Sequence, residues 1–309
     1  MVAPTGEQFE IAATGYRAVV TEGGATLRSL DLDGRPLLDG FAPDETPSGA
    51  RGQVLAPWVN RIRDGRYEFG GKSHQLPISE VPRNNASHGL VRWAAWTVEE
   101  HTDHSVSLLC RVMAQSGYPW TLDLHVLYDL SADGLTVTQS ATNLSPAAAP
   151  YAVGVHPYLA VGPGPIDGCE LTLPASTRLL ADPERKLPTG TEPVDGGAYD
   201  FRMARPIGAT VFDNAFTDLV RDAQGRATTV LHDPVAGQGV ALWVDARHSW
   251  LQVYSGEESP ETARRSLAVE PMTAPPDAFN SGTDLVVLAP AGTPGDDHTC
   301  SWGIRAITD

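Results

Sequence analysis

Two polar residues, His156 and Glu270, each lie between an apolar run and a proline, and both could transfer protons. His156 follows the run Val153–Val155 and precedes Pro157, which favours an extended or turn conformation at a strand end. Glu270 ends the run Leu267–Val269 and is also followed by a proline. A buried imidazole could act as an acid near neutral pH, and a buried carboxylate with a raised pKa could act as a base. The alternatives are a hydrogen-bonded core histidine and a glutamate that faces solvent.

Three further polar residues could hold the hydroxyl groups of a ligand. Arg61 follows a Pro-Trp loop, so its planar guanidinium could bind neighbouring hydroxyls or a carboxylate, with Trp58 as a stacking face; otherwise it binds carbonyls of its own loop. His88 precedes Gly89, which lets backbone or a ligand approach closely; otherwise it is a loop histidine bonded to backbone. Asp213 lies between aromatic residues and could accept hydrogen bonds from hydroxyls, or form an Asx turn.

Other familiar chemistries lack support in the sequence. It has no GxSxG, HExxH, GxxxxGK[ST] or strand-linked GxGxxG motif, which disfavours ester hydrolysis by that route, zinc proteolysis and nucleotide binding. His101 and His104 lie in a polar turn with poor ligand spacing, so no metal is expected there. Cys110, Cys169 and Cys300 are far apart and form no CxxC pair, which argues against a disulfide framework or a zinc cluster.

The composition indicates a folded, acidic protein of 309 residues, with 41% hydrophobic and 19% charged residues. Its formal net charge of -16 repels phosphate backbones and anionic lipids, so nucleic acid and membranes are not expected partners. No window approaches the roughly 18 apolar residues of a transmembrane helix. The N-terminal residues have neither a basic start nor an apolar h-region, so we expect a cytoplasmic protein.

Period-two alternation of apolar and polar residues dominates the chain and predicts half-buried strands. Thr121–Leu127 is the clearest case, and Asp133-Gly134 predicts a two-residue hairpin turn between it and Leu135–Thr138. Asp33-Gly34 and Gly70-Gly71 predict two more hairpins. Further strands are expected at Tyr16–Val20, Val106–Val112, Gly239–Asp245, Trp250–Tyr254 and Asp284–Leu288.

The expected helices are only single turns, at Pro260–Arg265 and Pro276–Phe279, each opened by a proline. Because βαβ alternation and internal repeats are both missing, a parallel α/β sheet and a solenoid are disfavoured. The stretches Gly162–Gly168 and Ala181–Ala198 are rich in Gly, Pro and charge and could be linkers, but strands continue on both sides. We therefore expect residues 1–309 to form a single all-β, antiparallel domain with long functional loops.

Six segments, taken in order, resemble the aldose 1-epimerase family, also called galactose mutarotases. They extend over nearly the whole chain: Asn60–Ile62, Gly65–Gly71, Asn84–Arg92, Val153–Leu159, Phe212–Leu219 and Ala268–Gly282. Each motif alone is weak, whereas six in the same order are a strong signal. The resemblance implies a large antiparallel β-sandwich, the galactose mutarotase-like supersandwich, with the sugar bound in a cleft on one concave sheet. It also implies no metal and no organic cofactor.

The resemblance implies a role for each candidate residue. Glu270 corresponds to the family's general base and His156 to its general acid. Arg61, His88 and Asp213 correspond to the residues that position the sugar and its developing charge. The resemblance adds, as residues lining the cleft, Asn60, Gln252, Tyr254 and Trp58.

The expected activity is interconversion of the α and β anomers of a free aldohexose, by a monomer or homodimer whose partner is this small sugar. One alternative is a hexose-6-phosphate 1-epimerase, which needs a cationic pocket; the chain has only two lysines, Lys72 and Lys186, although its arginines could build one. Another is a non-catalytic carbohydrate-binding protein of the same fold, although both proton-transfer residues are present. A glycoside hydrolase or lyase would instead need a carboxylate pair, or a Tyr or Arg base.

Overall fold

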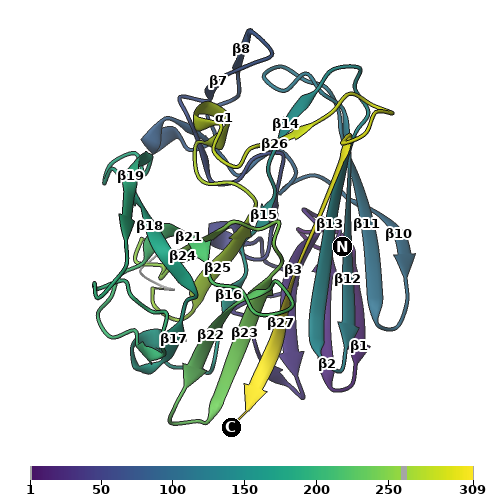
Figure 1. Cartoon of the computed structure of the whole chain (residues 1–309). Coiled ribbons are helices and arrows are strands. Elements are labelled where there is room, and N and C mark those ends of the chain that lie inside the picture. Colours follow the sequence, from purple (N-terminus) through teal and green to yellow (C-terminus); the bar gives the residue numbers. More distant parts are fainter. Residues whose placement is uncertain (1, 259–262, 309) are drawn as a thin grey trace.

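The computed structural model describes residues 2–258 and 263–308, and most regular structure within them is antiparallel strand (Figure 1). This confirms the all-β prediction. The one α-helix in this part of the chain is a single turn, α1 (Ala278–Ser281), close to the turn predicted at Pro276–Phe279. Short 3-10 turns occur at Ser48–Ala50, Val81–Arg83 and Ile166–Gly168. The other predicted helical turn, Pro260–Arg265, lies largely outside the described residues.

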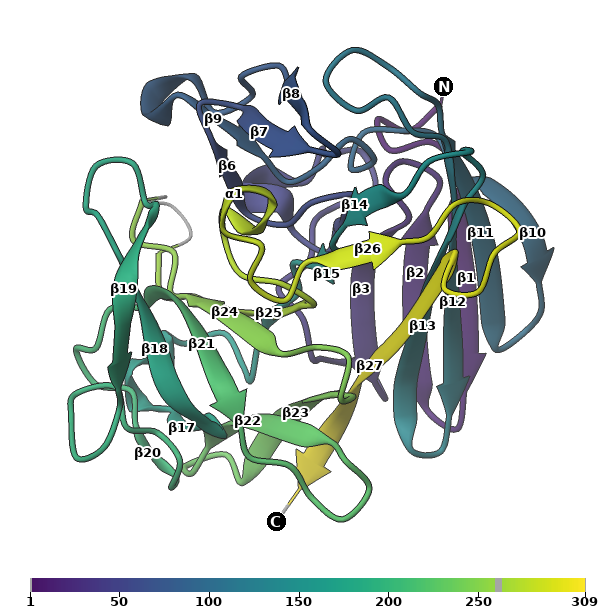
Figure 2. The same cartoon turned by 45° about the horizontal axis from the view of Figure 1, so that its top comes forward.

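The largest sheet has nine strands, and its order is β10-β11-β12-β13-β27-β23-β22-β17-β20. Their bounds are β10 Thr97–His101, β11 Ser105–Val112, β12 Leu122–Ser131, β13 Gly134–Asn143, β27 Asp297–Thr308, β23 Gln238–Val244, β22 Ala227–Asp233, β17 Glu170–Thr172 and β20 Arg205–Pro206. β27 pairs with β13 on one side and with β23 on the other. It therefore joins the two halves of this sheet, as Figures 1 and 2 show.

A second sheet of eight strands runs β19-β18-β21-β24-β25-β15-β5, with β16 also paired to β25. Their bounds are β19 Pro188–Pro193, β18 Ala175–Ala181, β21 Asp213–Leu219, β24 Trp250–Tyr254, β25 Leu267–Met272, β15 Gly154–Val155, β5 Val54–Leu55 and β16 Tyr158–Leu159. The main hydrophobic core joins the two sheets: it contains Leu242 and Trp302 from the nine-stranded sheet and Leu251 and Val269 from the eight-stranded one. The predicted large antiparallel β-sandwich is thus confirmed.

Smaller sheets complete the molecule. The N-terminal strands form a four-stranded sheet: β1 Gln8–Ala13, β2 Tyr16–Thr21, β3 Thr26–Leu32 and β4 Arg35–Pro36. Three two-stranded sheets pair β6 Arg61–Arg63 with β9 Asn85–Ser87, β7 Arg66–Phe69 with β8 Lys72–Gln75, and β14 Ala149–Tyr151 with β26 Val286–Leu288. The β6–β9 pair matters most for function because Arg61 opens β6 and His88 directly follows β9.

The three predicted hairpins form, but one turns at a different pair of residues. Asp33–Gly34 connects β3 to β4 and Gly70–Gly71 connects β7 to β8, and all of these turn residues have positive φ. In the β12–β13 hairpin, Ser131 pairs with Gly134, so the turn consists of Ala132–Asp133. Gly134, with φ 101°, provides the positive φ at the position after the turn, where it begins β13.

Part of the stretch Ala181–Ala198, expected as a long loop, forms the strand β19. Prolines begin and end this strand. Because β19 is the edge strand of its sheet, its prolines can face away from the neighbouring strand without removing a ladder hydrogen bond. The hairpin loop Asp182–Leu187 remains irregular, and it contributes a residue to the site described below.

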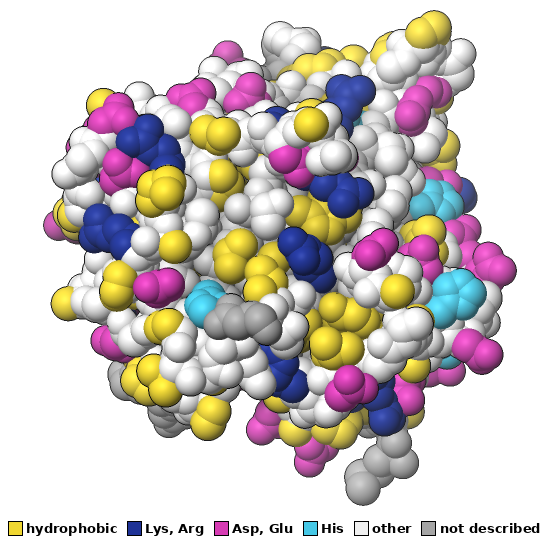
Figure 3. Space-filling view, turned by 60° about the horizontal axis from the view of Figure 1, so that its bottom comes forward, with side chains coloured by type: hydrophobic (Ala, Val, Ile, Leu, Met, Phe, Trp, Pro, Cys, Tyr) yellow, Lys and Arg dark blue, Asp and Glu magenta, His cyan; other side chains and the backbone are white. Residues whose placement is uncertain are grey.

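The surface agrees with the acidic composition. Among the described residues on the face drawn in Figure 3, acidic and basic side chains are interspersed, so the basic groups do not form one continuous surface. Within residues 2–258 and 263–308, none of the helices has the length and hydropathy that crossing a membrane requires.

Candidate active site

A cavity of about 430 Å³ that is open to solvent lies over one face of the eight-stranded sheet and is bordered by loops. Its volume suits a small organic ligand. Of the nine residues that the sequence placed at the site, all but Trp58 line its wall: Asn60, Arg61, His88, His156, Asp213, Gln252, Tyr254 and Glu270. Segments that are far apart in the sequence therefore meet at one place.

The register of three strands aligns the side chains on the floor of the cavity. Asp213 of β21 pairs with Tyr254 of β24, and Gln252 of β24 pairs with Glu270 of β25. Residues directly opposite in an antiparallel pair share a face of the sheet, and so do residues two positions apart. All of these side chains therefore project towards the cavity, whereas Val253 projects into the core on the opposite face.

His156 reaches the same face from the connection between β15 and β16. Its Nε2 atom lies 3.2 Å from Glu270 Oε1. The imidazole is stacked on the ring of Tyr158, with centroids 4.9 Å apart and planes at 12°. The Tyr158 hydroxyl in turn donates a hydrogen bond of 2.9 Å to the carbonyl oxygen of Gly49. These contacts hold the imidazole in place beside the carboxyl group.

The remaining polar atoms of this group lack protein partners. Glu270 Oε2, His156 Nδ1 and His88 Nδ1 are buried and have no hydrogen-bond partner in the described part of the chain. The rings of His88 and His156 are 5.8 Å apart, edge to face, so these atoms belong to one site. Leaving a buried polar atom without a partner costs about 1–3 kcal/mol. Such atoms around one cavity can take their hydrogen bonds from water or from a ligand that replaces it.

Burial shifts the proton affinities of these groups towards their neutral forms. It lowers the pKa of His156 to about 3, and the nearby cations Arg51, Arg92 and Arg61 act in the same direction. It raises the pKa of Glu270 well above its usual range, and the negative charge of Asp213 raises it further. Perturbed pKa values of this kind are typical of groups that exchange protons with a ligand.

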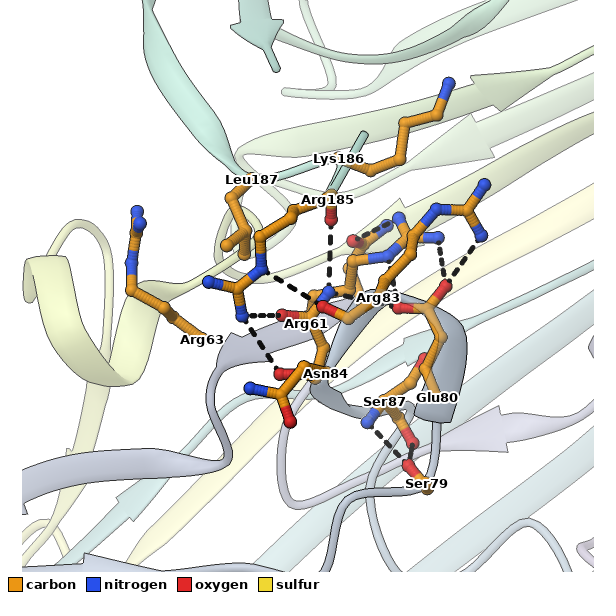
Figure 4. Close-up of polar contacts among 12 residues, drawn as sticks. Arg61, Arg63, Ser79, Glu80, Arg83, Asn84, Ser87, Arg185, Lys186 and Leu187 are labelled. Atoms are coloured by element: carbon orange, nitrogen blue, oxygen red, sulfur yellow. Dashed lines mark hydrogen bonds and ion pairs between the residues drawn. The ribbon is translucent and has the colours of Figure 1, made fainter. Parts of the chain in front are cut away.

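Arg61 is held by Glu80, which the sequence analysis did not identify (Figure 4). Its Nε and Nη2 atoms donate hydrogen bonds of 2.8 and 2.9 Å to the two carboxylate oxygens of Glu80. Glu80 also accepts from Arg83 Nη1 at 3.0 Å and Asn85 Nδ2 at 3.1 Å. In this structure the Arg61 fork is therefore bound to Glu80. Nη1, which donates to Asn60 Oδ1 at 3.2 Å, is the nitrogen outside this fork.

Asp213 is held by partners on both of its oxygens. Gln252 Nε2 donates to Oδ1 at 3.2 Å, and Lys186 Nζ lies 2.9 Å from Oδ2. Lys186 comes from the loop Asp182–Leu187 between β18 and β19. Each carboxylate oxygen can accept more than one hydrogen bond, so Asp213 retains capacity for ligand hydroxyls. Asp213 begins β21 in this arrangement and does not form the alternative Asx turn.

The position of His88 depends on the glycine that follows it. Gly89 has φ 72°, and a Cβ atom there would lie 2.0 Å from the carbonyl oxygen of Ala56. The same oxygen accepts a hydrogen bond of 2.7 Å from the Leu90 N–H. The His88 backbone N–H donates a hydrogen bond of 2.8 Å to the Asn60 carbonyl oxygen. The close approach predicted at Gly89 is therefore to backbone, and it fixes the loop that carries the imidazole.

The other charged residues around the cavity were not predicted from the sequence. Glu80, Arg83, Arg92 and Glu258 line the cavity, and Lys186 pairs with Asp213. Arg92 stands in the motif that contains His88, which was the only available signal for it. Trp58, expected to line the cleft, is instead buried in the core, where its ring packs edge to face with Phe279 at 6.3 Å.

The site is built for proton transfer and hydrogen bonding. Over residues 2–258 and 263–308, His, Cys, Asp and Glu side chains do not cluster in groups of three or more that could hold a metal ion. The described side chains offer one buried acid/base pair, formed by His156 and Glu270, and a ring of hydrogen-bonding groups around it.

Comparisons with known proteins agree with this description. A family model described as aldose 1-epimerase matches residues 7–293. The uncharacterized protein YihR of Escherichia coli (strain K12) is 38% identical over 285 residues, which cover 92% of this chain and 89% of that protein. The galactose mutarotase of Mus musculus is 27% identical over 277 residues, covering 82% and 78%. An aldose epimerase homologue from C. elegans shares the fold, with a TM-score of 0.84 at 20% identity, covering 98% and 99%.

Proposed function

Because the chain belongs to the aldose 1-epimerase family, we propose that it interconverts the α and β anomers of an unphosphorylated aldohexose by acid/base ring opening and reclosure. The observation that carries the proposal is the buried contact of 3.2 Å between His156 Nε2 and Glu270 Oε1. The two oxygens that exchange protons in this reaction, O1 and O5, are bonded to the same carbon of the sugar. An acid and a base in contact with each other can therefore serve both oxygens at once.

In the proposed mechanism, the carboxylate of Glu270 takes the proton from the anomeric O1, and protonated His156 gives a proton to the ring oxygen O5. The C1–O5 bond breaks and C1 becomes an aldehyde. Rotation about C1–C2 presents the other face of the aldehyde to O5. His156 then takes the O5 proton back while Glu270 returns a proton to O1, which closes the ring as either anomer.

The pair holds one proton between its members at every stage. With the closed sugar that proton is on His156, and with the open aldehyde it is on Glu270. Burial favours the neutral forms of both groups, because it lowers the pKa of His156 and raises the pKa of Glu270. The environment thus favours the protonation state that accompanies the open-chain intermediate.

The other residues hold the sugar in this position. Asp213 and Gln252 offer hydrogen bonds to hydroxyls beside Glu270, and His88 does so beside His156. Arg61, held by Glu80, adds positive charge near the pair. These residues do not transfer protons themselves. By holding the sugar close to the acid and the base, they raise the effective concentration of the reacting groups. The mechanism requires no metal and no organic cofactor.

We further propose that residues 1–309 act as one domain, in the cytoplasm, as a monomer or homodimer whose partner is the small sugar. The residues around the cavity support the single domain, because they come from segments between Pro47 and Glu270. The acidic net charge of -16 supports a small neutral or weakly charged substrate over nucleic acid or anionic membranes.

Polarimetry on freshly dissolved glucose, galactose, arabinose and xylose, with and without protein, tests the proposal. The protein should accelerate the approach to anomeric equilibrium for at least one sugar. Glu270→Gln and His156→Asn should each lower kcat by roughly 10²-fold or more, because each removes one of the two proton-transfer groups. Binding of the sugar, measured by calorimetry, should change little for Glu270→Gln, which keeps the shape of the side chain.

A matched control exists in the nine-stranded sheet. His125 Nδ1 and Glu99 Oε2 form a histidine–glutamate contact of 2.8 Å that is partly exposed and not part of the cavity. His125→Asn and Glu99→Gln should leave the rate unchanged. A normal rate for folded Glu270→Gln would refute the assignment of the base, and a wild-type protein inactive on every aldose would refute the proposed activity.

A further inference from the structure

Arg92 differs from the other cationic side chains around the cavity because it has no acidic partner. Arg61 binds Glu80, Arg83 binds Glu80 and Glu258, and Lys186 lies 2.9 Å from Asp213. The Arg92 guanidinium makes no hydrogen bond or ion pair with the described residues, and it lies over the ring of Trp93 at 5.6 Å.

Other arginines of the chain also lack an acidic partner, but among the described arginines that line the cavity Arg92 alone does so. Arg92 is half-buried, and burial lowers its pKa, which shows that its charge is partly desolvated. A desolvated charge without a counter-ion is costly to maintain. Hydroxyl groups of a neutral sugar do not require such a charge, whereas an anionic group on the ligand would neutralise it.

The backbone places Arg92 on the His156 side of the cavity. Gln53 connects the two residues: its side-chain amide donates a hydrogen bond of 2.6 Å to the Arg92 carbonyl, and its own carbonyl accepts from the His156 N–H at 3.2 Å. The charge of Arg92 also lowers the pKa of His88 and of His156. Asp213, which pairs with Lys186, lies near Glu270, and its charge acts on the pKa of that residue.

The orientation of the sugar follows from the proposed mechanism, on which this inference rests. If O1 lies against Glu270 and O5 against His156, then C5, which is bonded to O5, lies on the histidine side. The substituent on C5 of a hexopyranose is C6. It therefore extends towards Arg92, away from Asp213.

We infer that the substrate is a hexuronate, an aldose whose C6 is a carboxylate, and that Arg92 is the residue that selects it. One guanidinium carries one charge, and its planar fork matches the two oxygens of a carboxylate. A phosphate ester on C6 carries up to two charges, and Arg92 is the one cavity arginine without an acidic partner among the described residues. The observations therefore favour a carboxylate over a phosphate. Trp93, exposed at the same rim, shields one face of the guanidinium from water.

The test compares galacturonate and glucuronate with galactose, glucose and their 6-phosphates. Anomer exchange at equilibrium is measured by NMR exchange spectroscopy, which works equally for all of these sugars. We expect kcat/KM for a hexuronate to exceed that for its neutral parent by roughly tenfold or more, the usual value of a charge-assisted hydrogen bond. This preference should weaken as salt is added, because Arg92 is only half-buried.

Variants of Arg92 decide whether this residue causes the preference. Arg92→Gln should reduce the ratio of the two kcat/KM values to near one, and Arg92→Lys, which keeps the charge but not the fork, should retain part of it. The matched control is Arg226→Gln, because Arg226 lies over Trp243 at 3.9 Å, away from the cavity. It should leave the ratio unchanged. Thermal unfolding and calorimetric binding of hexuronate establish that each variant is folded and report its affinity.

The outcomes separate this inference from the proposed function. A wild-type protein that exchanges the anomers of neutral hexoses faster than those of hexuronates overturns the inference and leaves the function intact. A preference for the 6-phosphate over the hexuronate overturns the assignment to a carboxylate, and a ratio unaffected by Arg92→Gln overturns the role of Arg92. If the wild-type protein accelerates exchange for none of these sugars, the proposed function fails and the inference fails with it.

Discussion

The ammonium group of Lys186 lies 2.9 Å from Asp213 Oδ2, so a loop residue pairs with the first residue of β21. Lys186 sits in the loop between β18 and β19 with φ 58°, a conformation that is uncommon for a residue with a side chain. It is one of only two lysines in the sequence. The loop therefore supplies a specific counter-charge to a residue that lines the cavity.

Removing that counter-charge should weaken sugar binding. We expect Lys186→Met to raise KM about fivefold, which corresponds to about 1 kcal/mol for a partly exposed ion pair, with a smaller effect on kcat. Asp213 loses the contact that orients it, and its charge beside Glu270 is no longer balanced. Steady-state kinetics on the preferred sugar measure both constants. Lys72→Met, at the exposed start of β8, is the control; an equal effect there would contradict the specific role of Lys186.

Glu80 should matter for binding although it holds Arg61 rather than the sugar. Glu80→Gln keeps the shape but removes the charge that pairs with Arg61 and Arg83. We expect KM to rise by roughly tenfold, in the range for losing one charge-assisted hydrogen bond, and kcat to fall less. Glu80→Asp should restore part of the affinity. Glu192→Gln is the control, because Glu192 pairs with Arg178 between β18 and β19, outside the cavity. A uniform loss of kcat in Glu80→Gln would argue against a positioning role.

The pH profile should be bell-shaped, with its acid limb unusually low. Activity requires one proton on the His156–Glu270 pair, and the limbs report the gain of a second proton and the loss of the first. Burial lowers the pKa of His156 to about 3, so the second proton is gained only in strong acid. Burial raises the pKa of Glu270, so the alkaline limb lies well above that of an ordinary carboxyl. Initial rates corrected for spontaneous mutarotation should therefore be similar at about pH 5 and pH 7, whereas an acid limb near the usual imidazole pKa of about 6.5 would contradict this assignment.

Gly89→Ala should destabilise the protein and displace His88. A Cβ at this position would lie 2.0 Å from the Ala56 oxygen, in a backbone conformation with φ 72°. Gly70→Ala is a matched control, because φ there is 59° but nothing lies within 4 Å of the added carbon. We expect Gly70→Ala to cost about 1–2 kcal/mol for the positive φ alone, and Gly89→Ala to cost clearly more. Chemical denaturation measures both; equal costs would show that the Ala56 contact relaxes easily.

Dialysis against EDTA should leave the mutarotation rate unchanged. The proposed proton transfers use only His156 and Glu270, and the described residues offer no cluster of metal ligands around them. Rates before and after dialysis, with zinc or magnesium added back to a second sample, decide the question. A loss of activity that either metal restores would refute the metal-free mechanism.

The site residues that could be predicted from the sequence are those that form a distinctive local pattern. His156 and Glu270 interrupt apolar runs, and burying such groups is expensive unless they are used. The strand Trp250–Tyr254, which pairs with the strand that carries Glu270, was also predicted. Lys186 and Glu80 could not be predicted in this way, because each lies in a polar segment. Their partners, Asp213 and Arg61, come close only in the folded chain.

The same limit applies to the fold. The two-residue turns with positive φ were predicted because glycine and aspartate favour such turns, as at Asp33–Gly34 and Gly70–Gly71. The turn at Ala132–Asp133 was misplaced by one residue, because the glycine there serves the position after the turn. β19 was missed because its prolines disfavour a strand in general, and only its place at a sheet edge makes them acceptable.

The double pairing of β27 has a consequence for how the chain folds during synthesis. The hairpins formed by β11, β12 and β13, and by β22 and β23, connect neighbours in sequence and can form as soon as they leave the ribosome. β27 (Asp297–Thr308) is translated after every other strand of that sheet. Until it emerges from the ribosome, the edges of β13 and β23 that pair with it have unpaired backbone N–H and C=O groups. Open strand edges attract other chains, and long-range pairing is slow. The interval before β27 inserts is therefore the period in which a nascent chain of this protein is most exposed to aggregation.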